Sequence, residues 1–474
     1  MDLEAILRHI DSNFDKYLEE IRAYLRQTGV STTGEGMDEA AAYTADLVSR
    51  IGGSVELVET AGNPVVFGRL RSGDPNAKTL IASSLYDVVP ADPSDWITDP
   101  FGAEIVNSRE HPEVGWEVCA GPTLVGRGSR NQRGPNLAFM LALNSIREAT
   151  GDVPVNVIFT FDGEEEISSP SWIEFLEHKK DELLTADAAY QHGFRQDENG
   201  RHMIHLGFKG VSLFELVVEG GEWGGTRDGS DLGPGDIIWV DSPPLVLMNA
   251  VTSLFDENGR CAVDGFWDNV APATPREEEL LEIIRVQFDE QAAKKARNIS
   301  KFRGHKPASE LYTDYSSAPI LNIDGLVSGY TTESYTTVLP MKAVAKMDVR
   351  LVPNQTLEEF YDKLRAHLDR RGFQMVQIKR RGGVQPGKSD PDNPMVSAAV
   401  NATTHFGIES QVWPISSAGN PLAFYARPPF NLPIMFAGTG FSSKSHMPNE
   451  WASVEGIKHS MKWIAVFLDE WSRS

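Results

Sequence analysis

Hydrophobic residues recur at helical spacing over residues 3–25 of the chain. Apolar side chains appear every three or four residues, from Leu3 and Ile6 to Ile21 and Leu25, and charged residues fill the positions between them. This spacing predicts an amphipathic helix that packs on a larger body. A second helix is predicted around 37–51, where two consecutive glycines end it.

Short runs rich in β-branched residues follow, at 79–82 and 155–161, with a continuous apolar stretch at 137–146 between them. The two runs predict strands, and the apolar stretch predicts a buried helix. Strand, helix and strand at this spacing are typical of a mostly parallel α/β sheet.

The hydrophobic pattern changes after about residue 205. Two strands and two helices are predicted in alternation, at 211–218, 277–297, 341–350 and 357–368. They indicate a small α+β domain. Its exit is the polar stretch at 382–394, rich in Gly, Pro and Asp, where few packing contacts are expected.

From residue 395 the α/β pattern resumes, and the chain closes with another amphipathic helix. The sequence therefore predicts one discontinuous α/β domain, formed by 1–205 and 386–474. We expect an α+β domain, residues 206–385, to be inserted into it.

Composition narrows the class of protein. The chain has 474 residues, with 44 Lys and Arg against 67 Asp and Glu, and a formal net charge of −23. This acidic excess excludes a general nucleic-acid binder, because a phosphate backbone requires a basic surface. No run approaches the roughly 18 apolar residues of a membrane span. With only Cys119 and Cys261 as cysteines and no signal-like leader, we expect a cytoplasmic protein without membrane or nucleic-acid partners.

Polar residues follow three predicted strand ends, after 79–82, after the short apolar run Leu124-Val125 and after 155–161. Asp87 comes after the first strand, a glycine-rich turn occupies 126–134, and three glutamates stand at 164–166 after the strand at 155–161. Taken singly, each is also compatible with an ordinary turn or a solvated loop. Because ligands bind at the carboxyl ends of parallel strands, the three together predict a polar site. Clustered carboxylates repel one another, and a cation or a catalytic role normally offsets that cost.

As a set, the motifs resemble those of the zinc-dependent exopeptidase and amidohydrolase family that includes carboxypeptidase G, carnosinase, aminoacylase and succinyl-diaminopimelate desuccinylase. The matching segments are Tyr86-Asp87-Val88-Val89-Pro90, Trp96 with Asp99-Pro100-Phe101, Gly126-Arg127-Gly128, Glu164-Glu165-Glu166-Ile167, Arg350-Leu351-Val352-Pro353-Asn354-Gln355 and His446-Met447-Pro448-Asn449-Glu450. The resemblance covers almost the whole chain. It implies a zinc-binding α/β domain interrupted by a lid and dimerisation domain, and hence a homodimer.

The resemblance also implies roles for individual residues. Glu165 matches the general base that deprotonates the water attacking an amide carbonyl, and Glu166 and His446 match metal ligands. Asp87 matches the carboxylate that orients a ligand histidine. Arg350 matches the lid residue that holds the carboxylate of a small-molecule substrate.

Other positions of the expected site depart from the family pattern. Leu85 stands where the family has its first ligand histidine, and Asn131 stands where it has the bridging aspartate. Near 191–193, where a third carboxylate is expected, the chain has Gln191 and His192. One metal position has thus lost its ordinary ligands. For the other we expect Glu166, His446 and the Asn131 oxygen, with His192 as a candidate recruit.

The substrate loop of the family is rich in glycine. In this chain Gly419 and Asn420 lie at that place and are candidate substrate-binding residues.

Three hypotheses follow. The first is a hydrolase of an amide or peptide-type C–N bond in a small carboxylate-bearing amino-acid derivative or dipeptide, with Glu165 as base and at most one divalent metal, zinc or manganese. The second is a metal-independent enzyme on the same fold, for amide formation, cyclisation or elimination, with Glu165 and Asp87 as acid and base. The third is a catalytically inactive binding homologue.

Overall fold

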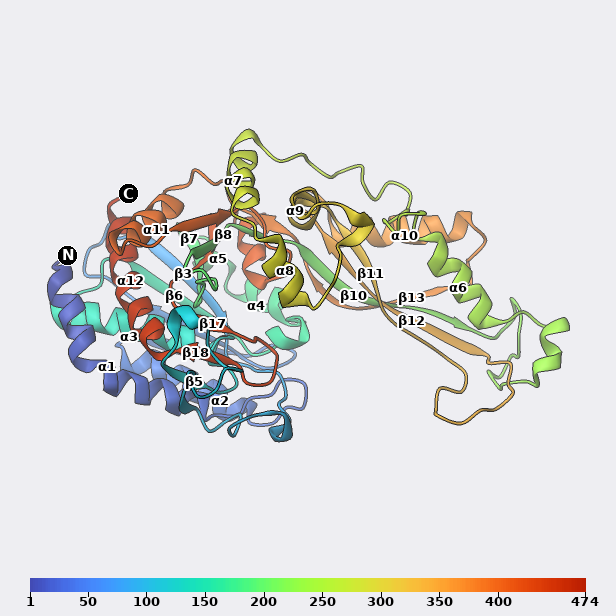
Figure 1. Cartoon of the computed structure of the whole chain (residues 1–474), viewed down its shortest axis with the longest axis horizontal. Coiled ribbons are helices and arrows are strands. Elements are labelled where there is room, and N and C mark those ends of the chain that lie inside the picture. The colour runs from blue at the N-terminus through green and yellow to red at the C-terminus, as the bar shows by residue number, and fades with distance from the viewer.

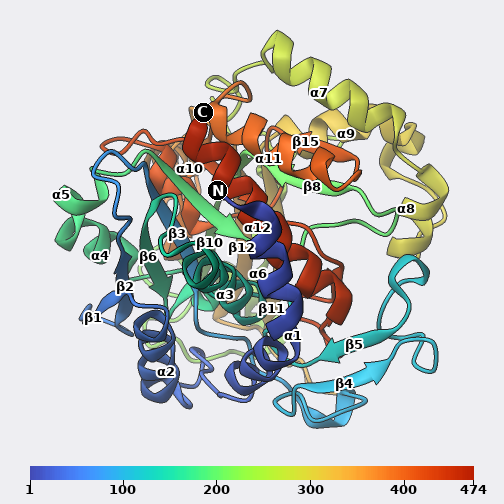
Figure 2. The same cartoon turned by 90° about the vertical axis from the view of Figure 1, so that its left-hand side faces the viewer.

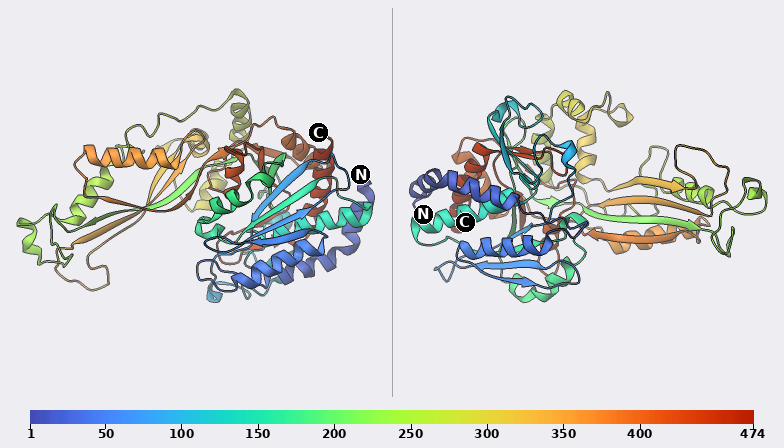
Figure 3. Two further views of the ribbon diagram at one scale, coloured as in Figure 1. Left: turned by 180° about the vertical axis from the view of Figure 1, so that it is seen from behind. Right: turned by 90° about the horizontal axis from the view of Figure 1, so that it is seen from below.

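The computed structural model describes the backbone of residues 1–474 and all side chains except those at 296, 297, 305, 308–310 and 312. The chain forms two parts (Figures 1 and 3). One contains both termini and the larger sheet, and the other is elongated and extends away from it. None of the described helices has the length and apolar character needed to cross a bilayer.

The larger sheet is mixed, with a parallel centre. In sheet order its strands are β1 (Ser54–Val58), β2 (Val65–Leu70), β6 (Asn156–Asp162), β3 (Thr79–Leu85), β7 (Ala188–His192), β16 (Ile434–Ala437), β8 (His202–His205) and β15 (Ser410–Trp413). The pairs β6–β3, β3–β7, β7–β16 and β8–β15 are parallel. This confirms the predicted α/β class and the strands at 79–82 and 155–161.

Helices cover both faces of this sheet because strand residues alternate between the faces. In β6, Val157 and Phe159 contact one core cluster, and Ile158 contacts another. The first face carries α1 (Leu3–Leu25), α2 (Met37–Arg50), α3 (Arg133–Thr150), α11 (Pro394–His405) and α12 (Val454–Arg473), several of which lie in front of the sheet in Figure 2. The second face carries α4 (Trp172–His178), α5 (Lys180–Leu183) and the 3-10 turn η6 (Pro421–Ala426).

The predicted N-terminal helix is confirmed. Its stripe of Ile6, Ile10, Phe14 and Ile21 is buried, and helix α1 packs against α3 and α12. Since α12 is the last helix, the two ends of the chain lie together, and the amino group of Met1 pairs with Asp469 at 2.8 Å.

The elongated part is built on an antiparallel sheet. In sheet order its strands are β11 (Ile320–Ser328), β12 (Lys342–Leu351), β10 (Gly210–Glu219) and β13 (Gln377–Val384). Helices α6 (Pro243–Ser253) and α10 (Leu357–Arg370) pack on one face. As predicted, Ala343, Ala345, Met347 and Val349 of β12 share this buried face. Arg350 therefore lies on the opposite face.

Three details of this part differ from the prediction. The helix expected at 277–297 is two helices, α7 (Pro275–Val286) and α8 (Glu290–Arg297), because Asp289 caps the second by accepting hydrogen bonds from the backbone of Gln291 and Ala292. The sequence pattern missed β11, β13, α6 and α9 (Ala308–Ser317). Strand β11 is an edge strand with mostly exposed residues, so it lacks the alternation that reveals a half-buried strand.

The polar stretch at 382–394 is also more packed than expected. It contains the end of β13 and the short strand β14 (Gly387–Lys388), which pairs with β9 (Gly207–Phe208). Pro386, Gly387 and Ser389 are buried. The domain boundary near 385 stays a prediction.

A small antiparallel sheet stands beside the larger one, with the order β17 (Ser442–Ser443), β18 (Trp451–Ser453), β5 (Pro122–Val125) and β4 (Glu104–Asn107). The expectation that the strand before the glycine-rich turn belongs to the parallel sheet is therefore wrong. Strand β5 instead pairs with β18, and this pairing joins the turn to the C-terminal segment. The remaining 3-10 turns are η1 (Pro93–Asp95), η2 (Glu117–Cys119), η3 (Glu165–Ile167), η4 (Pro234–Ile238) and η5 (Arg303–His305).

Candidate active site

The acidic run after β6 divides into carboxylates that hold the loop and carboxylates that face the site. Glu164 is buried, and its two carboxylate oxygens accept hydrogen bonds from the backbone N–H groups of Asn63 at 3.0 Å and Ser171 at 3.1 Å. Asp162, the last residue of β6, accepts one from the backbone of Glu164 at 2.9 Å. These bonds fix the loop, and Glu165 and Glu166 remain for chemistry.

Three of the predicted ligands meet in space. Glu166 Oε2 lies 3.0 Å from His446 Nε2, and the side-chain amide of Asn131 lies 2.7 Å from Glu166 Oε1 and 2.9 Å from His446 Nε2. The hydrogen bond to Glu166 raises the pKa of His446. The three side chains come from the turn before α3, the turn after β6 and the loop before β18, which only the fold brings together.

Glu450 holds the glycine-rich turn in place. Its carboxylate is fully buried and accepts hydrogen bonds from the backbone of Arg130 at 2.9 Å and Asn131 at 2.7 Å. The same carboxylate pairs with Arg127 at 2.8 Å. Sequence reasoning gave Glu450 no role, although its place four residues after His446 in a shared motif was a usable signal.

Asp87 holds the turn that carries Glu165 and Glu166. It is fully buried, and its Oδ2 accepts a hydrogen bond from the backbone N–H of Glu166 at 3.0 Å. Burial raises the pKa of Asp87 well above its usual range, and the nearby carboxylates of Asp162 and Glu166 raise it further. With a leucine at position 85, Asp87 orients the backbone of the turn instead of a ligand histidine.

Glu165 has the electrostatic surroundings of a strong base. Burial raises its pKa well above that of a free glutamate, and the charges of Glu166, Asp87 and Asp162 add to the effect. A carboxylate with a raised pKa is a stronger base, so its ionised form takes a proton from water more readily.

Two cavities meet at Glu165. One, of about 170 Å³, is also lined by Asn131 and His446, and the other, of about 130 Å³, is also lined by Arg350. Gly419 and Asn420 line both. Glu165, Gly419 and Asn420 thus lie where the two cavities adjoin, with Asn131 and His446 in one cavity and Arg350 in the other.

The loop with the predicted substrate-binding residues Gly419 and Asn420 is held by contacts with the larger sheet and with the inserted sheet. Asn420 donates a hydrogen bond from its amide to Gln191 Oε1 at 2.7 Å, and its own oxygen accepts one from the backbone of Leu422 at 2.8 Å. At Gly419, a Cβ atom would lie 2.4 Å from Cγ2 of Val211 in β10. A side chain there would push the loop off the inserted sheet, so glycine is required at this contact.

Arg350 reaches the site from the uncovered face of the inserted sheet. Its Nε forms an ion pair with Asp348 Oδ1 at 2.7 Å, and its side chain is 33% exposed. The ion pair orients the guanidinium along the cavity wall.

The structure does not bring His192 to the site, and the prediction that it is a metal ligand is wrong. Its Nδ1 lies 2.8 Å from the Tyr190 hydroxyl and its Nε2 lies 2.9 Å from the Ser460 hydroxyl. Burial lowers the pKa of His192 to about 3. The residue points toward α12 because it lies on the face of β7 that carries α3 and α12, and alternation places its neighbour Gln191 on the other face.

Two arginines of the site were missed by sequence reasoning. Arg130 and Arg195 both line the cavity that contains Asn131 and His446. Burial lowers the pKa of Arg195 to about 9, and the nearby charge of Arg130 adds to the effect. The position of Arg130 directly before Asn131 could have identified it as a site residue. No feature of the sequence around Arg195 indicates that it lies at the site.

The raised pKa of the buried Asp162 can be tested through its effect on the stability of the folded protein. Burial raises the pKa of Asp162 to about 6 from an ordinary value of 3.8. The folded state therefore loses stability as the pH rises from about 4 to about 6, by roughly 3 kcal/mol in total. We expect Asp162→Asn to be more stable than the unmodified protein at pH 8, with no difference at pH 3.5.

Urea unfolding at both pH values measures this difference. Asp181→Asn, at an exposed position of helix α5, serves as the matched control. Equal stabilities at pH 8 would show that Asp162 ionises without cost in the folded protein.

The fold and site agree with one family of known proteins. The family model described as peptidase family M20/M25/M40 matches residues 84–470. The chain belongs to this family, which makes it an enzyme of the metallopeptidase and amidohydrolase type.

Individual relatives span nearly the whole chain. A Beta-Ala-His dipeptidase of Rattus norvegicus is 24% identical over 98% of this chain and 95% of its own length. Cys-Gly metallodipeptidase DUG1 of Saccharomyces cerevisiae is 24% identical over 87% of this chain and 82% of its own. Among solved structures, the M20 family metallo-carboxypeptidase Sso-CP2 from Sulfolobus solfataricus superposes with a TM-score of 0.86 and 29% identity, covering 97% of this chain and 99% of that one.

Proposed function

We propose that the protein hydrolyses a peptide-type C–N bond in a dipeptide or another small amino-acid derivative with a free carboxylate. The observation that carries the proposal is the position of Glu165, at the wall shared by a cavity with the ligand cluster and a cavity with Arg350. The names of the rat and yeast relatives, both dipeptidases, support the substrate class.

In the proposed reaction Glu165 takes a proton from the attacking water and returns it to the leaving amine. Its raised pKa suits both steps, because the group must hold the proton between them. Asp87 keeps the Glu165–Glu166 turn in position through the backbone of Glu166. Arg130 and Arg195 add positive charge to the cavity that receives the carbonyl group.

The residues present fit one divalent cation. Glu166, His446 and the side-chain oxygen of Asn131 would hold it. The amide nitrogen of Asn131 now faces Glu166, and a half-turn of the amide group about its last side-chain bond would place the amide oxygen there instead. Such a cation supplies Lewis-acid polarisation of the substrate carbonyl when bound. The second position does not fit, because Leu85 has no ligating atom and Gln191 is engaged by Asn420. Among the described side chains, no group of three His, Cys, Asp or Glu residues is arranged to hold a metal.

Arg350 would bind the substrate carboxylate. A guanidinium is suited to this role because it presents paired N–H donors, and charge-assisted hydrogen bonds are stronger than neutral ones. The cavity of about 130 Å³ beside it accommodates a small terminal residue.

Arg350→Met should raise KM with a smaller effect on kcat. Loss of one charged hydrogen-bonding partner costs about 1.5–3 kcal/mol, which corresponds to a roughly 10- to 150-fold higher KM. Lys346→Met is the matched control, because Lys346 lies on the same face of β12 and is exposed. Steady-state kinetics with a dipeptide and its C-terminal amide would show whether the loss depends on the carboxylate.

The hydrolysis itself is tested with a panel of unblocked dipeptides, followed by amine release, in the presence of zinc, manganese or a chelator. Multiple turnovers that depend on added metal support the proposal. Turnover that a chelator leaves unchanged favours the metal-independent enzyme, and no turnover with any member of the panel contradicts the proposal.

We also propose that the protein is a homodimer, associated through the inserted domain. Large apolar side chains are exposed on that domain, including Ile238 and Trp239, which are 81% and 83% exposed, and Leu326 on edge strand β11. Light scattering of the purified protein tests this. A cytoplasmic location is proposed as well, and the free thiols of Cys119 and Cys261 support it.

A further inference from the structure

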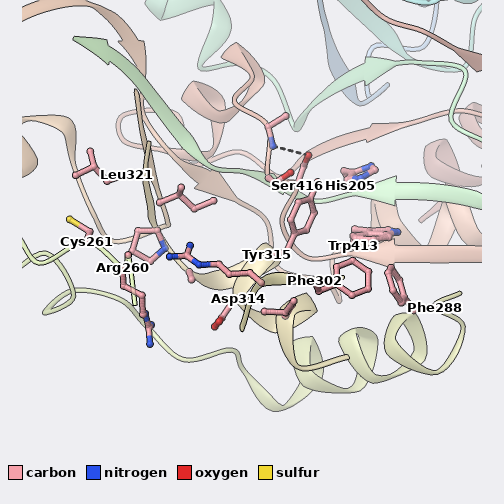
Figure 4. A pocket seen from close by; sticks show the side chains of 18 of the residues that line it. His205, Arg260, Cys261, Phe288, Phe302, Asp314, Tyr315, Leu321, Trp413 and Ser416 are labelled. Carbon is pink, nitrogen blue, oxygen red and sulfur yellow. Dashed lines mark hydrogen bonds between the residues drawn. The ribbon is translucent and has the colours of Figure 1, made fainter. Parts of the chain in front are cut away.

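A large chamber lies next to the catalytic cavities. Its volume is about 670 Å³, and it lies between β8 and the edge strand β15 on one side and the segment around α8 and α9 of the inserted part on the other; Figure 4 shows its lining side chains. Cavities of several hundred Å³ hold ligands the size of a drug molecule. The two spaces at Glu165, of about 170 and 130 Å³, are much smaller. A simple dipeptide would leave the chamber empty.

Aromatic rings line this chamber from several separate elements. Trp413 comes from β15, Phe288 and Phe302 flank α8, and Tyr315 comes from α9, and Figure 4 shows their rings around one end of the space. Trp413 is stacked on His205 with ring centres 5.7 Å apart. Flat rings arranged in this way favour a planar aromatic ligand over a flexible polar one.

The charged residues of the chamber are mainly positive. Arg195, Arg260 and Arg303 line it, against Asp314 as the acidic residue among the described lining side chains. Arg195 lies over the ring of Phe436 at 4.7 Å, and Arg260 lies over Trp267 at 4.5 Å. An arginine that lies over an aromatic ring keeps N–H groups that can donate to an anionic group.

The chamber opens toward the catalytic base. Arg195, Ser416 and Ala418 line both the chamber and the cavity that contains Glu165. The far wall is anchored by Lys209, which is buried and donates hydrogen bonds from Nζ to the carbonyl groups of Tyr315 and Ala318, both at 2.7 Å. The backbone N–H of Lys209 also donates to the carbonyl groups of Ser416 at 3.2 Å and Ala418 at 3.1 Å, so the same residue holds this wall and the passage.

We propose that the chamber binds a planar aromatic group with a negative charge, as the part of the substrate on the far side of the scissile bond from Arg350. This inference rests on the proposed function, because it assigns the substrate class of the same site. The bond to be cleaved lies at Glu165, the terminal carboxylate lies at Arg350, and the aromatic acyl group passes Arg195 into the chamber.

Binding can be measured without turnover. Isothermal titration with 2-naphthoate should give a dissociation constant at least tenfold below that of 2-naphthylmethylammonium, its cationic counterpart, and acetate should not bind. Arg195→Gln and Phe302→Ala should each weaken 2-naphthoate binding at least tenfold. Arg227→Gln, at an exposed position of the inserted part, should have no effect. Circular dichroism melting confirms that each variant is folded.

Cleavage is then compared for N-(4-carboxybenzoyl)glycine, N-benzoylglycine and N-acetylglycine. We expect kcat/KM to fall at least tenfold at each step of this series. If 2-naphthoate binds as described but none of the conjugates or dipeptides is cleaved, the chamber assignment holds and the hydrolase proposal fails. If dipeptides are cleaved while 2-naphthoate does not bind, or binds no better than the ammonium compound, the chamber assignment is overturned.

Discussion

The Glu165→Gln variant is expected to hydrolyse substrate about 1000-fold more slowly than the unmodified enzyme, with KM little changed. Glutamine has nearly the same shape as glutamate, so the two cavities and the Asn131, Glu166 and His446 cluster should stay intact. Its amide, however, cannot take a proton from water. The loss therefore falls on kcat, which single-turnover measurements can assign to the chemical step.

The neighbouring Glu164 provides a matched control. It belongs to the same acidic run, but its carboxylate accepts two backbone hydrogen bonds and is buried. Glu164→Gln should lower the melting temperature and retain most of kcat. If Glu165→Gln keeps the kcat of the unmodified enzyme, the base is another group.

The pH profile gives a second measure of the same residue. Since only ionised Glu165 can accept a proton, kcat/KM should rise with pH through its pKa. Burial and the neighbouring carboxylates raise that pKa well above the usual glutamate range, so the rise should come at correspondingly higher pH. The residual activity of Glu165→Gln should lack this rise.

The second large effect is expected in metal binding. His446→Ala should lower the affinity for zinc or manganese at least about 100-fold, because it removes one of two strong ligands. Asn131→Asp should raise the affinity about tenfold or more, since it adds a negative charge to the same cluster. Competition with a chromogenic chelator measures both affinities.

Asn76→Asp, on an exposed loop, is the control for the added charge. Elemental analysis of the purified protein completes the test. Less than about a tenth of an equivalent of bound metal, with activity indifferent to chelator, would contradict the one-cation proposal.

Part of the site was predictable because short motifs contain it. Glu165 and Glu166 follow a buried strand directly, and Asp87 follows the neighbouring strand, so the sheet alone places them together. The family resemblance identified His446 and Arg350 on the same basis. His192 was misassigned because its side chain faces α3 and α12. Neighbouring residues of a strand point to opposite faces, so a shift of one position separates a site residue from a core residue.

The inserted domain shows where pattern reading failed. Its core strand β12 has a clear alternation and was found, whereas edge strand β11 exposes most of its residues and was not. The break between α7 and α8 depends on a single cap at Asp289 within a continuously charged stretch. Hydrophobic periodicity detects burial, so elements with little burial escape it.

The sequence by itself determined the class of the fold, the family and the chemical types available to the site, because local periodicity and ordered motifs need no knowledge of distant contacts. Only the tertiary structure decided which of those groups meet. His446 adopts a left-handed backbone with φ of 61° in a loop far along the chain, and the buried Glu450 draws the turn with Asn131 to it. The aromatic chamber beside Arg195 likewise has no local signature, since its walls come from two sheets and the helices between them.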